Sequence, residues 1–219
     1  MKGAPRSKEF DDVYFSAENG FAETEYVFLE GNDLPERWQR REGFTIFETG
    51  FGTGLNFLCA WRLWNETNAG GKLHFISVEK FPLTREEIEN ALEPWRKKFP
   101  GELKALLEKY PDNISGTHRI AMSENCILTL IFYDVNAAMP EINKKIDCWF
   151  LDGFKPRKNP EMWTETIFQN MARLSNAGAT FATFTAAGFV RRGLRAAGFD
   201  VKRIKGYGTK WHMIKGMKL

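Results

Sequence analysis

The sequence has few of the residues from which disulfide frameworks and metal centres are built. Its 219 residues include three cysteines without a C-x-x-C spacing and three scattered histidines. We therefore expect Cys59, Cys126 and Cys148 to pack as reduced core residues, and we expect no metal site. Apolar runs of the roughly 18 residues that span a membrane are missing, as is a signal peptide near the first residue. These absences predict a soluble, cytoplasmic protein with no membrane partner.

Charge is distributed unevenly along the chain. The net charge is +3, and 43% of the residues are hydrophobic, which is enough to bury the core of one domain. Residues 155–219 contain 13 Lys and Arg against 3 Asp and Glu, whereas residues 1–154 contain 18 against 25. The surplus of +10 in the last third indicates a polyanion partner. A solvated basic surface without a partner explains the surplus equally well.

Three alternating glycines follow an apolar run near residue 45. The run Phe44–Phe47 is rich in residues that favour strands, and Glu48 separates it from Gly50, Gly52 and Gly54. An apolar pattern of helical period comes next, so the segment predicts a strand, a tight turn and a helix. Glycine allows positive φ in the turn, and a helix N-terminus directs its N–H groups at a ligand. The dinucleotide fingerprint fits less well because it needs Gly or Ala at position 55. A purely structural turn is the alternative.

Acidic residues end three further apolar runs. The runs are Lys72–Glu79, Ile127–Asp134 and Ile146–Asp152, and the last is the most continuously apolar, which predicts a central strand. In doubly wound sheets, a carboxylate at the end of the second strand accepts hydrogen bonds from ribose hydroxyls. Glu79 is close to the expected interval after Gly54. A strand-end carboxylate in water is the alternative for Glu79.

Short β-type runs lie near both ends of the chain. Asp12–Ser16 and Glu25–Leu29, separated by an Asn-Gly turn signal, predict an N-terminal β-hairpin. Val201–Lys205 and Trp211–Ile214 predict an antiparallel hairpin at the other end. Helices are predicted over Asp33–Trp38, Thr84–Trp95, Glu102–Tyr110, Val135–Ile142, Trp163–Leu174 and Ala186–Ala197.

The alternation of strands and helices predicts an α/β protein with a mostly parallel, Rossmann-like sheet. We expect the N-terminal hairpin to be an extension over residues 1–40 that packs on a main domain over residues 41–219. In this prediction the two parts form a single globular unit.

A loop punctuated by Gly and Pro follows the run that ends at Asp152. The segment Asp152–Trp163 contains two prolines, aromatic side chains and three basic residues. Loops at the carboxyl edge of a parallel sheet present side chains to ligands, so this loop is the expected place for reactive groups. An Asp that only bonds the N–H groups of the loop is the alternative for Asp152.

Several segments together resemble a known family. Glu48–Phe57 is similar to the first motif of Rossmann-like methyltransferases. With Leu151–Trp163 and Thr183–Leu194, it resembles the methyltransferase domain of the MnmC family of bacterial tRNA wobble-uridine enzymes. Further agreement comes from Asp12–Ser16, Glu79–Thr84 and Gly206–Lys210. The resemblance covers about residues 10–215.

The resemblance implies that S-adenosylmethionine methylates the exocyclic amine of 5-aminomethyl-(2-thio)uridine at position 34 of tRNA. The expected partner is the anticodon stem-loop of tRNA, and an FAD-dependent oxidoreductase domain or protein is expected to act on the same nucleoside. No second glycine fingerprint is visible, so no FAD is expected in this chain. A small-molecule amine methyltransferase of the same fold is the alternative. A non-catalytic RNA-binding module is disfavoured, because the glycine turn and the acids are intact.

The resemblance also implies roles for individual residues, with Glu79 at the ribose and Asp134 at the adenine. Asp152 is the expected catalytic residue, because a carboxylate can orient the amine and accept the proton lost before in-line attack. Phe154 is expected to stack on the flipped uracil, and basic residues to hold phosphates. The expected cofactor contacts are Glu48, Gly50, Gly52, Gly54, Asn56, Glu79, Lys80, Asp134 and Asp152. The expected RNA contacts are Phe154, Lys155, Arg157, Lys158, Asn159, Trp163, Arg191 and Arg192.

Overall fold

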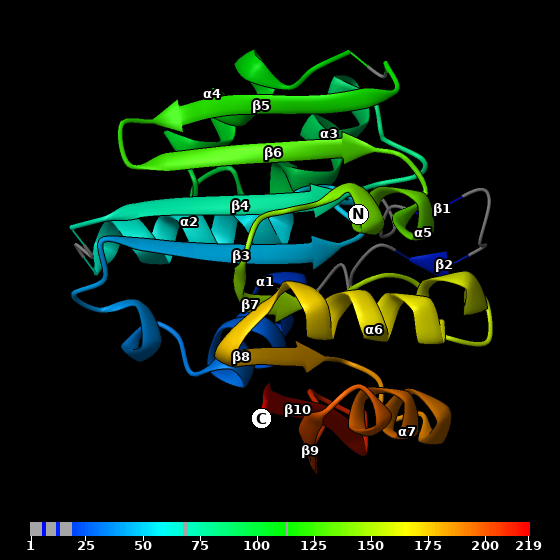
Figure 1. Ribbon diagram of the computed structural model, residues 1–219. Helices are drawn as coiled ribbons and strands as arrows, with labels where there is room; N and C mark the ends of the chain where they lie inside the picture. Colours follow the sequence, from blue (N-terminus) through cyan, green and yellow to red (C-terminus); the bar gives the residue numbers. More distant parts are fainter. Residues whose placement is uncertain (1–5, 8–11, 14–18, 68–69, 113) are drawn as a thin grey trace.

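An eight-stranded mixed sheet forms the centre of the protein in the computed structural model, which describes residues 6–7, 12–13, 19–67, 70–112 and 114–219 (Figure 1). The strand order is β5-β6-β4-β3-β7-β8-β10-β9. From β3 the chain adds β4 and then β6 toward one edge of the sheet. It then returns to the other side of β3 and adds β7 and β8 toward the opposite edge, so the direction of winding reverses between β3 and β7. The parallel strands are β3 (Gly43–Thr49), β4 (Lys72–Val78), β6 (Cys126–Phe132), β7 (Ile146–Phe150) and β8 (Ser175–Thr183). The predicted Rossmann-like α/β sheet is confirmed.

Antiparallel strands form both edges of the sheet. β10 (His212–Lys218) pairs with β8 on one side and with β9 (Phe199–Lys205) on the other, so β9 is an edge strand. The predicted C-terminal hairpin is therefore confirmed. The strand at the opposite edge, β5 (Gly116–Ser123), is not predicted from the sequence. Its side chains are exposed or half-buried except for Met122, so it lacks the apolar run that marks the other strands.

Helices cover both faces of the sheet, and each layer packs on a buried apolar cluster (Figure 1). One layer contains α2 (Leu55–Glu66), α3 (Arg85–Leu92) and α4 (Glu102–Lys109). The other contains α5 (Val135–Ala138), α6 (Glu165–Leu174) and α7 (Gly188–Ala196). All three cysteines are buried and have free thiols. Within the described ranges, no helix is long and apolar enough to cross a membrane.

Side-chain caps explain where several helices begin. The Thr84 hydroxyl accepts the N–H of Glu87, whose carboxylate accepts the N–H of Thr84, so α3 starts with a capping box. Asp134 caps α5 at 2.8 Å from the N–H of Asn136, and Thr164 caps α6. Short 3₁₀ turns are found at Glu30–Asn32, Glu36–Trp38, Glu93–Trp95, Met139–Glu141 and Pro160–Trp163.

The predicted strand at Glu25–Leu29 is wrong. These residues form a π-helical turn that continues α1 (Gly20–Thr24). The Tyr-Val-Phe-Leu composition favours a strand, yet the three successive side chains at 27–29 are all buried. A solvent-facing strand would bury only every second side chain, so packing against the sheet has overridden the local preference.

The other N-terminal predictions are met in part. Asp12–Val13 is a strand, but it pairs with Arg6–Ser7 and not with the segment that follows it. Residues 14–16 of the predicted first strand lie outside the described residues. Asp33 adopts a φ of 55° and does not cap the predicted helix, which is only a 3₁₀ turn over Glu36–Trp38. The division of the chain at residue 40 stays a prediction.

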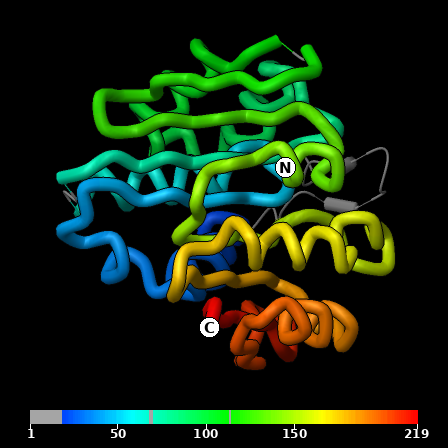
Figure 2. The backbone as a smooth tube through the Cα atoms, in the orientation of Figure 1, coloured from blue at the N-terminus to red at the C-terminus, as the bar shows by residue number. Residues whose placement is uncertain are grey.

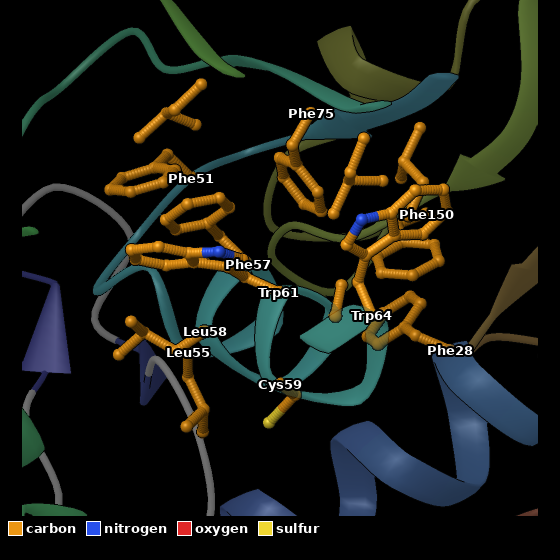
Figure 3. Close-up of a cluster of buried hydrophobic side chains, with 14 of the residues drawn as sticks. Phe28, Phe51, Leu55, Phe57, Leu58, Cys59, Trp61, Trp64, Phe75 and Phe150 are labelled. Carbon is orange, nitrogen blue, oxygen red and sulfur yellow. The ribbon is translucent and has the colours of Figure 1, made fainter. Parts of the chain in front are cut away.

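The N-terminal helical segment lies beside the C-terminal hairpin, although the two are far apart in sequence (Figure 2). Lys215 donates to Asp33 at 2.7 Å, and the Tyr26 hydroxyl donates to the carbonyl of Lys205 at 3.1 Å. Phe28 stacks on Phe150 of β7 with 5.2 Å between ring centroids (Figure 3). These contacts hold the segment across the sheet, next to the carboxyl ends of the strands.

We predict that Phe28→Ala will lower the free energy of unfolding by about 3 kcal/mol or more, because it removes a ring that is 4% exposed and leaves a cavity against β7. Urea denaturation of the purified protein measures the change. Phe189→Ala is the matched control, since that ring is 43% exposed, and it should change stability by about 0.5 kcal/mol or less. Equal effects of the two changes would show that the N-terminal segment does not depend on Phe28 for docking.

Candidate functional site

A cavity of about 480 Å³ opens at the carboxyl ends of the parallel strands. Its walls come from the loops after β3, β4, β6 and β7, and from α1 together with the turn that follows it. It therefore lies at the point where the winding of the sheet reverses, which is where ligands bind in open α/β sheets. The volume is in the range of sites for small molecules and cofactors.

The glycine turn forms one wall of this cavity. Gly50, Gly52 and Gly54 have φ values of 89°, 53° and 81°, in the region that favours glycine, and they connect β3 to α2 as predicted. A Cβ atom at Gly50 would lie 3.6 Å from the Cα atom of Gly153, so the turn packs against the loop after β7. Gly50 and Gly52 line the cavity, whereas Gly54 precedes the first residue of α2.

Glu79 connects the end of β4 to the glycine turn. Its Oε2 accepts the N–H of Gly52 and its Oε1 accepts the N–H of Phe81, both at 2.9 Å. Burial raises the pKa of Glu79, and these backbone donors oppose the rise. The N–H groups of Lys80 and Phe51 also lower this pKa, and the ionised carboxylate is an acceptor-only group. Glu79 lines the cavity, and its contact with a ribose stays a prediction.

Lys80 and Asp134 form an ion pair at the ends of β4 and β6. The Lys80 ammonium lies 3.0 Å from Asp134 and 3.4 Å from Glu161. Burial opposes ionisation of Asp134, but the bonds from Lys80 and Asn136 outweigh it and lower its pKa. Both residues line the cavity, next to the half-exposed ring of Tyr133. A planar ligand can stack on this ring while Asp134 accepts from its edge.

The side-chain amide of Asn56 links two carboxyl groups. Its Nδ2 donates to Glu48 at 2.9 Å and to Asp152 at 2.7 Å, and its Oδ1 accepts the hydroxyl of Thr24 at 2.7 Å. Ser77 donates to the second oxygen of Glu48 at 2.7 Å. Glu48 is fully buried and lies beneath the cavity, so it reaches the cavity only through Asn56. Its predicted contact with a cofactor has no direct counterpart among the residues that line the cavity.

The two linked carboxyl groups differ in their accessibility. Burial, followed by the charge of Asp152, raises the pKa of Glu48 well above its usual range. Burial also raises the pKa of Asp152, to about 6, although the N–H of Gly153 at 2.8 Å and the Asn56 amide oppose it. Asp152 lines the cavity and is partly exposed. A carboxylate with a pKa near 6 can accept and return a proton near neutral pH.

The predicted RNA contacts divide between the cavity and the surface. Phe154, Lys155 and Asn159 line the cavity. Trp163 is 5% exposed and packs edge-on against Phe184 with 6.4 Å between centroids, so its side chain belongs to the core. Outside the cavity lie Arg157, Lys158 and Arg192, which are exposed, and Arg191, which is half-buried.

Several cavity residues are missing from the prediction. Glu23 and Thr24 belong to α1, which directly precedes the segment where a strand was expected, and Phe184 follows β8. Lys210 lies in the turn between β9 and β10. The sequence signal that could have placed Lys210 at the cavity is the resemblance of the segment Gly206–Lys210 to the family. No group of three or more potential metal ligands occurs in the part of the chain that the structure describes.

Comparison with known proteins identifies relatives of the whole chain. Residues 97–219 match the family described as S-adenosyl-L-methionine-dependent methyltransferase. The tRNA 5-methylaminomethyl-2-thiouridine biosynthesis bifunctional protein MnmC of Methylobacillus flagellatus is 49% identical over 223 residues, covering 98% of this chain and 34% of that protein. Its counterpart in Stutzerimonas stutzeri is 50% identical over 219 residues, covering 98% and 33%. The chain thus spans about a third of the length of these curated relatives.

A solved structure supports the same relationship. The crystal structure of MNMC2 from Aquifex aeolicus superimposes with a TM-score of 0.76 at 26% sequence identity. The match covers 96% of this chain and 65% of that one. The similarity therefore includes the sheet, both helical layers and the segments that surround the cavity.

We predict that Asn56→Ala will lower the free energy of unfolding by about 1 to 3 kcal/mol at pH 8, because two carboxyl groups lose a shared donor. Without Asn56, the folded-state pKa of each group rises further, so the folded state binds more protons than the unfolded state. The free energy of unfolding of the variant then falls as pH rises, so the difference between the wild type and the variant should be smaller at pH 6 than at pH 8. Urea denaturation at both pH values measures this, with Asn65→Ala, an exposed residue of the same helix, as the control. An equal loss of stability at both pH values would show that the Asn56 amide does not hold down the pKa values of Glu48 and Asp152.

Proposed function

The chain belongs to the family of S-adenosyl-L-methionine-dependent methyltransferases, and on that basis we propose that it methylates the exocyclic amine of 5-aminomethyl-(2-thio)uridine at wobble position 34 of tRNA. The relatives that match nearly the whole chain are named for the biosynthesis of tRNA 5-methylaminomethyl-2-thiouridine. The observation that carries the proposal is Asp152, a carboxylate that lies on the cavity wall, is held there by Asn56 and has a raised pKa.

S-adenosylmethionine fits the residues on the glycine side of the cavity. The glycine turn lets the backbone approach the amino-acid end, and Glu79 presents an acceptor-only carboxylate to the ribose hydroxyls at the cavity wall. Asp134 and the ring of Tyr133 suit the amino edge and the face of the adenine. When bound, the cofactor supplies an electrophilic methyl group on a sulfonium.

Asp152 prepares the acceptor for methylation in this proposal. An alkylamine has a pKa near that of lysine, about 10.4, and enters as an ammonium that cannot attack. Asp152 accepts one proton and orients the neutral amine toward the methyl group, while the Asn56 amide holds the carboxylate in place. The phenyl ring of Phe154, which also lines the cavity, can stack on a flipped pyrimidine.

The RNA backbone is assigned to cations beside the cavity. Arg157 and Lys158 are exposed in the loop that begins at Asp152, and Lys155 of the same loop reaches the cavity wall. Phosphates held there would bring the anticodon strand over the reacting amine. Arg191 and Arg192 lie in the helix after the adjacent strand, and we assign them to the RNA backbone as well.

A second activity on the same nucleoside is also part of the proposal. The curated relatives are named bifunctional and are about three times as long as this chain. We propose an FAD-dependent oxidoreductase, as a domain or as a separate protein, as the partner that supplies the free amine.

Undermodified tRNA that carries 5-aminomethyl-2-thiouridine should become labelled when incubated with this protein and methyl-labelled S-adenosylmethionine, as nucleoside analysis will show. Because only ionised Asp152 accepts the proton, the single-turnover rate should rise about tenfold per pH unit below pH 6 and then level off. Asp152→Asn should slow the reaction by about 10²- to 10⁴-fold. Equal labelling of the free nucleoside would favour the small-molecule alternative, and a rate that is flat across pH 6 would remove Asp152 as the base.

Arg157→Ala/Lys158→Ala should weaken tRNA binding and reduce its salt dependence. Each phosphate contact on a single strand contributes a slope of about −0.7 to log affinity against log salt, so losing two contacts should flatten the slope by about 1.4. Lys72→Ala/Lys144→Ala, which removes two exposed cations at the opposite end of the strands, is the matched control and should leave the slope unchanged. A salt dependence equal to that of the wild type in Arg157→Ala/Lys158→Ala would show that these two residues do not contact RNA phosphates.

A further inference from the structure

Two segments from opposite ends of the chain meet on the cavity wall. Glu23 belongs to α1, and Lys210 belongs to the turn between β9 and β10. The Lys210 ammonium forms an ion pair with the Glu23 carboxylate and lies 4.9 Å from the centroid of the Phe184 ring. All three side chains line the cavity. The arrangement is a primary ammonium held between a carboxylate and the face of an aromatic ring.

This pair lies close to the catalytic carboxylate. Thr24, the neighbour of Glu23, donates to Asn56, and Asn56 in turn donates to Asp152. The charge of Glu23 raises the pKa of Asp152 and the charge of Lys210 lowers it, so both charges act on the position where the amine is activated.

We propose that Glu23 and Phe184 form the binding site for the primary ammonium of the acceptor, and that the Lys210 ammonium occupies this site until the substrate displaces it. The proposal rests on the function proposed above, in which the acceptor is an aminomethyl group. Lysine and an aminomethyl nucleoside present the same chemical group, an ammonium on a methylene carbon. A carboxylate and an aromatic face are the two features that bind such a cation.

The two members of the pair are not equally fixed. The Glu23 side chain is 19% exposed on a helical turn, whereas the Lys210 side chain is 44% exposed in a loop. Lysine has a flexible four-carbon stem and a strongly hydrated head, so it leaves more readily than the carboxylate. The exchange therefore keeps Glu23 in place and releases Lys210 to solvent or to a phosphate of the RNA.

In this proposal the carboxylates of Glu23 and Asp152 have different roles. Glu23 binds the incoming ammonium, and Asp152 accepts the proton that the ammonium must lose before it can attack. One proton moves from the substrate nitrogen to an oxygen of Asp152, and the charge on Glu23 is unchanged.

A structural clamp is the competing explanation, and the molecule contains a comparison for it. Lys215 pairs with Asp33 at 2.7 Å and joins the same two parts of the chain, but neither residue lines the cavity. A clamp and a binding site make opposite demands on the ion pair. Loss of either partner weakens a clamp, whereas loss of the competing cation improves a binding site.

The test measures binding of two nucleosides that lack phosphate, 5-aminomethyl-2-thiouridine and its 5-hydroxymethyl analogue. Both are titrated calorimetrically into the protein loaded with S-adenosylhomocysteine, the demethylated form of the cofactor, so that no methyl transfer can occur. Glu23→Gln should weaken binding of the aminomethyl nucleoside by about tenfold or more, the scale of one charged hydrogen bond. Lys210→Met should strengthen its binding several-fold. Neither change should alter binding of the hydroxymethyl analogue, and Asp33→Asn and Lys215→Met should alter neither nucleoside.

Three results would overturn the ammonium site. They are a loss of affinity in both Glu23→Gln and Lys210→Met, equal effects on the two nucleosides, or a wild-type protein that does not prefer the aminomethyl nucleoside. Wild-type methylation of undermodified tRNA, measured on the same preparation, tests the proposed function separately. An active wild type with any of the three results would reject the ammonium site and keep the function.

Discussion

The carboxyl groups of Glu48 and Asp152 lie side by side because the two N–H groups of the Asn56 amide donate one hydrogen bond to each. The amide oxygen is also occupied, by the hydroxyl of Thr24. A carboxamide has two donors and one acceptor group, so a single side chain joins β3, the loop after β7 and α1 with every polar atom satisfied. The positions of the Asp152 carboxylate, of Glu48 at the end of β3 and of Thr24 in α1 are thus coupled through this one residue.

The same network explains why one acid is chemically useful and the other is structural. Glu48 is sealed between Asn56 and Ser77 and has no access to the cavity. Asp152 has one oxygen on the Gly153 N–H and the other on Asn56, and it faces the cavity. Burial raises the pKa of both groups, but only Asp152 can exchange a proton with a ligand.

Sequence patterns predicted the parts of the fold whose chemistry is local. A run of apolar residues that ends in an acid defines β4 and β7 and the positions of Glu79 and Asp152, and alternating glycines define the turn. The helical turn at Glu25–Leu29 could not be predicted, because its composition favours a strand and this preference is overridden by the burial of three successive side chains in the folded protein. The missed part of the site, Glu23 with Lys210, comes from two distant segments that only the folded chain brings together.

The edge position of β9 gives the basic residues of the last third a further use. Lys202, Arg203 and Lys205 are exposed along this strand, whose outer side has no partner strand in the described sheet. An unpaired edge is a template for the edge of another molecule, and charged side chains oppose that pairing. The positive charges along β9 therefore disfavour pairing of this edge with a strand of a second copy, a physical effect that does not require RNA.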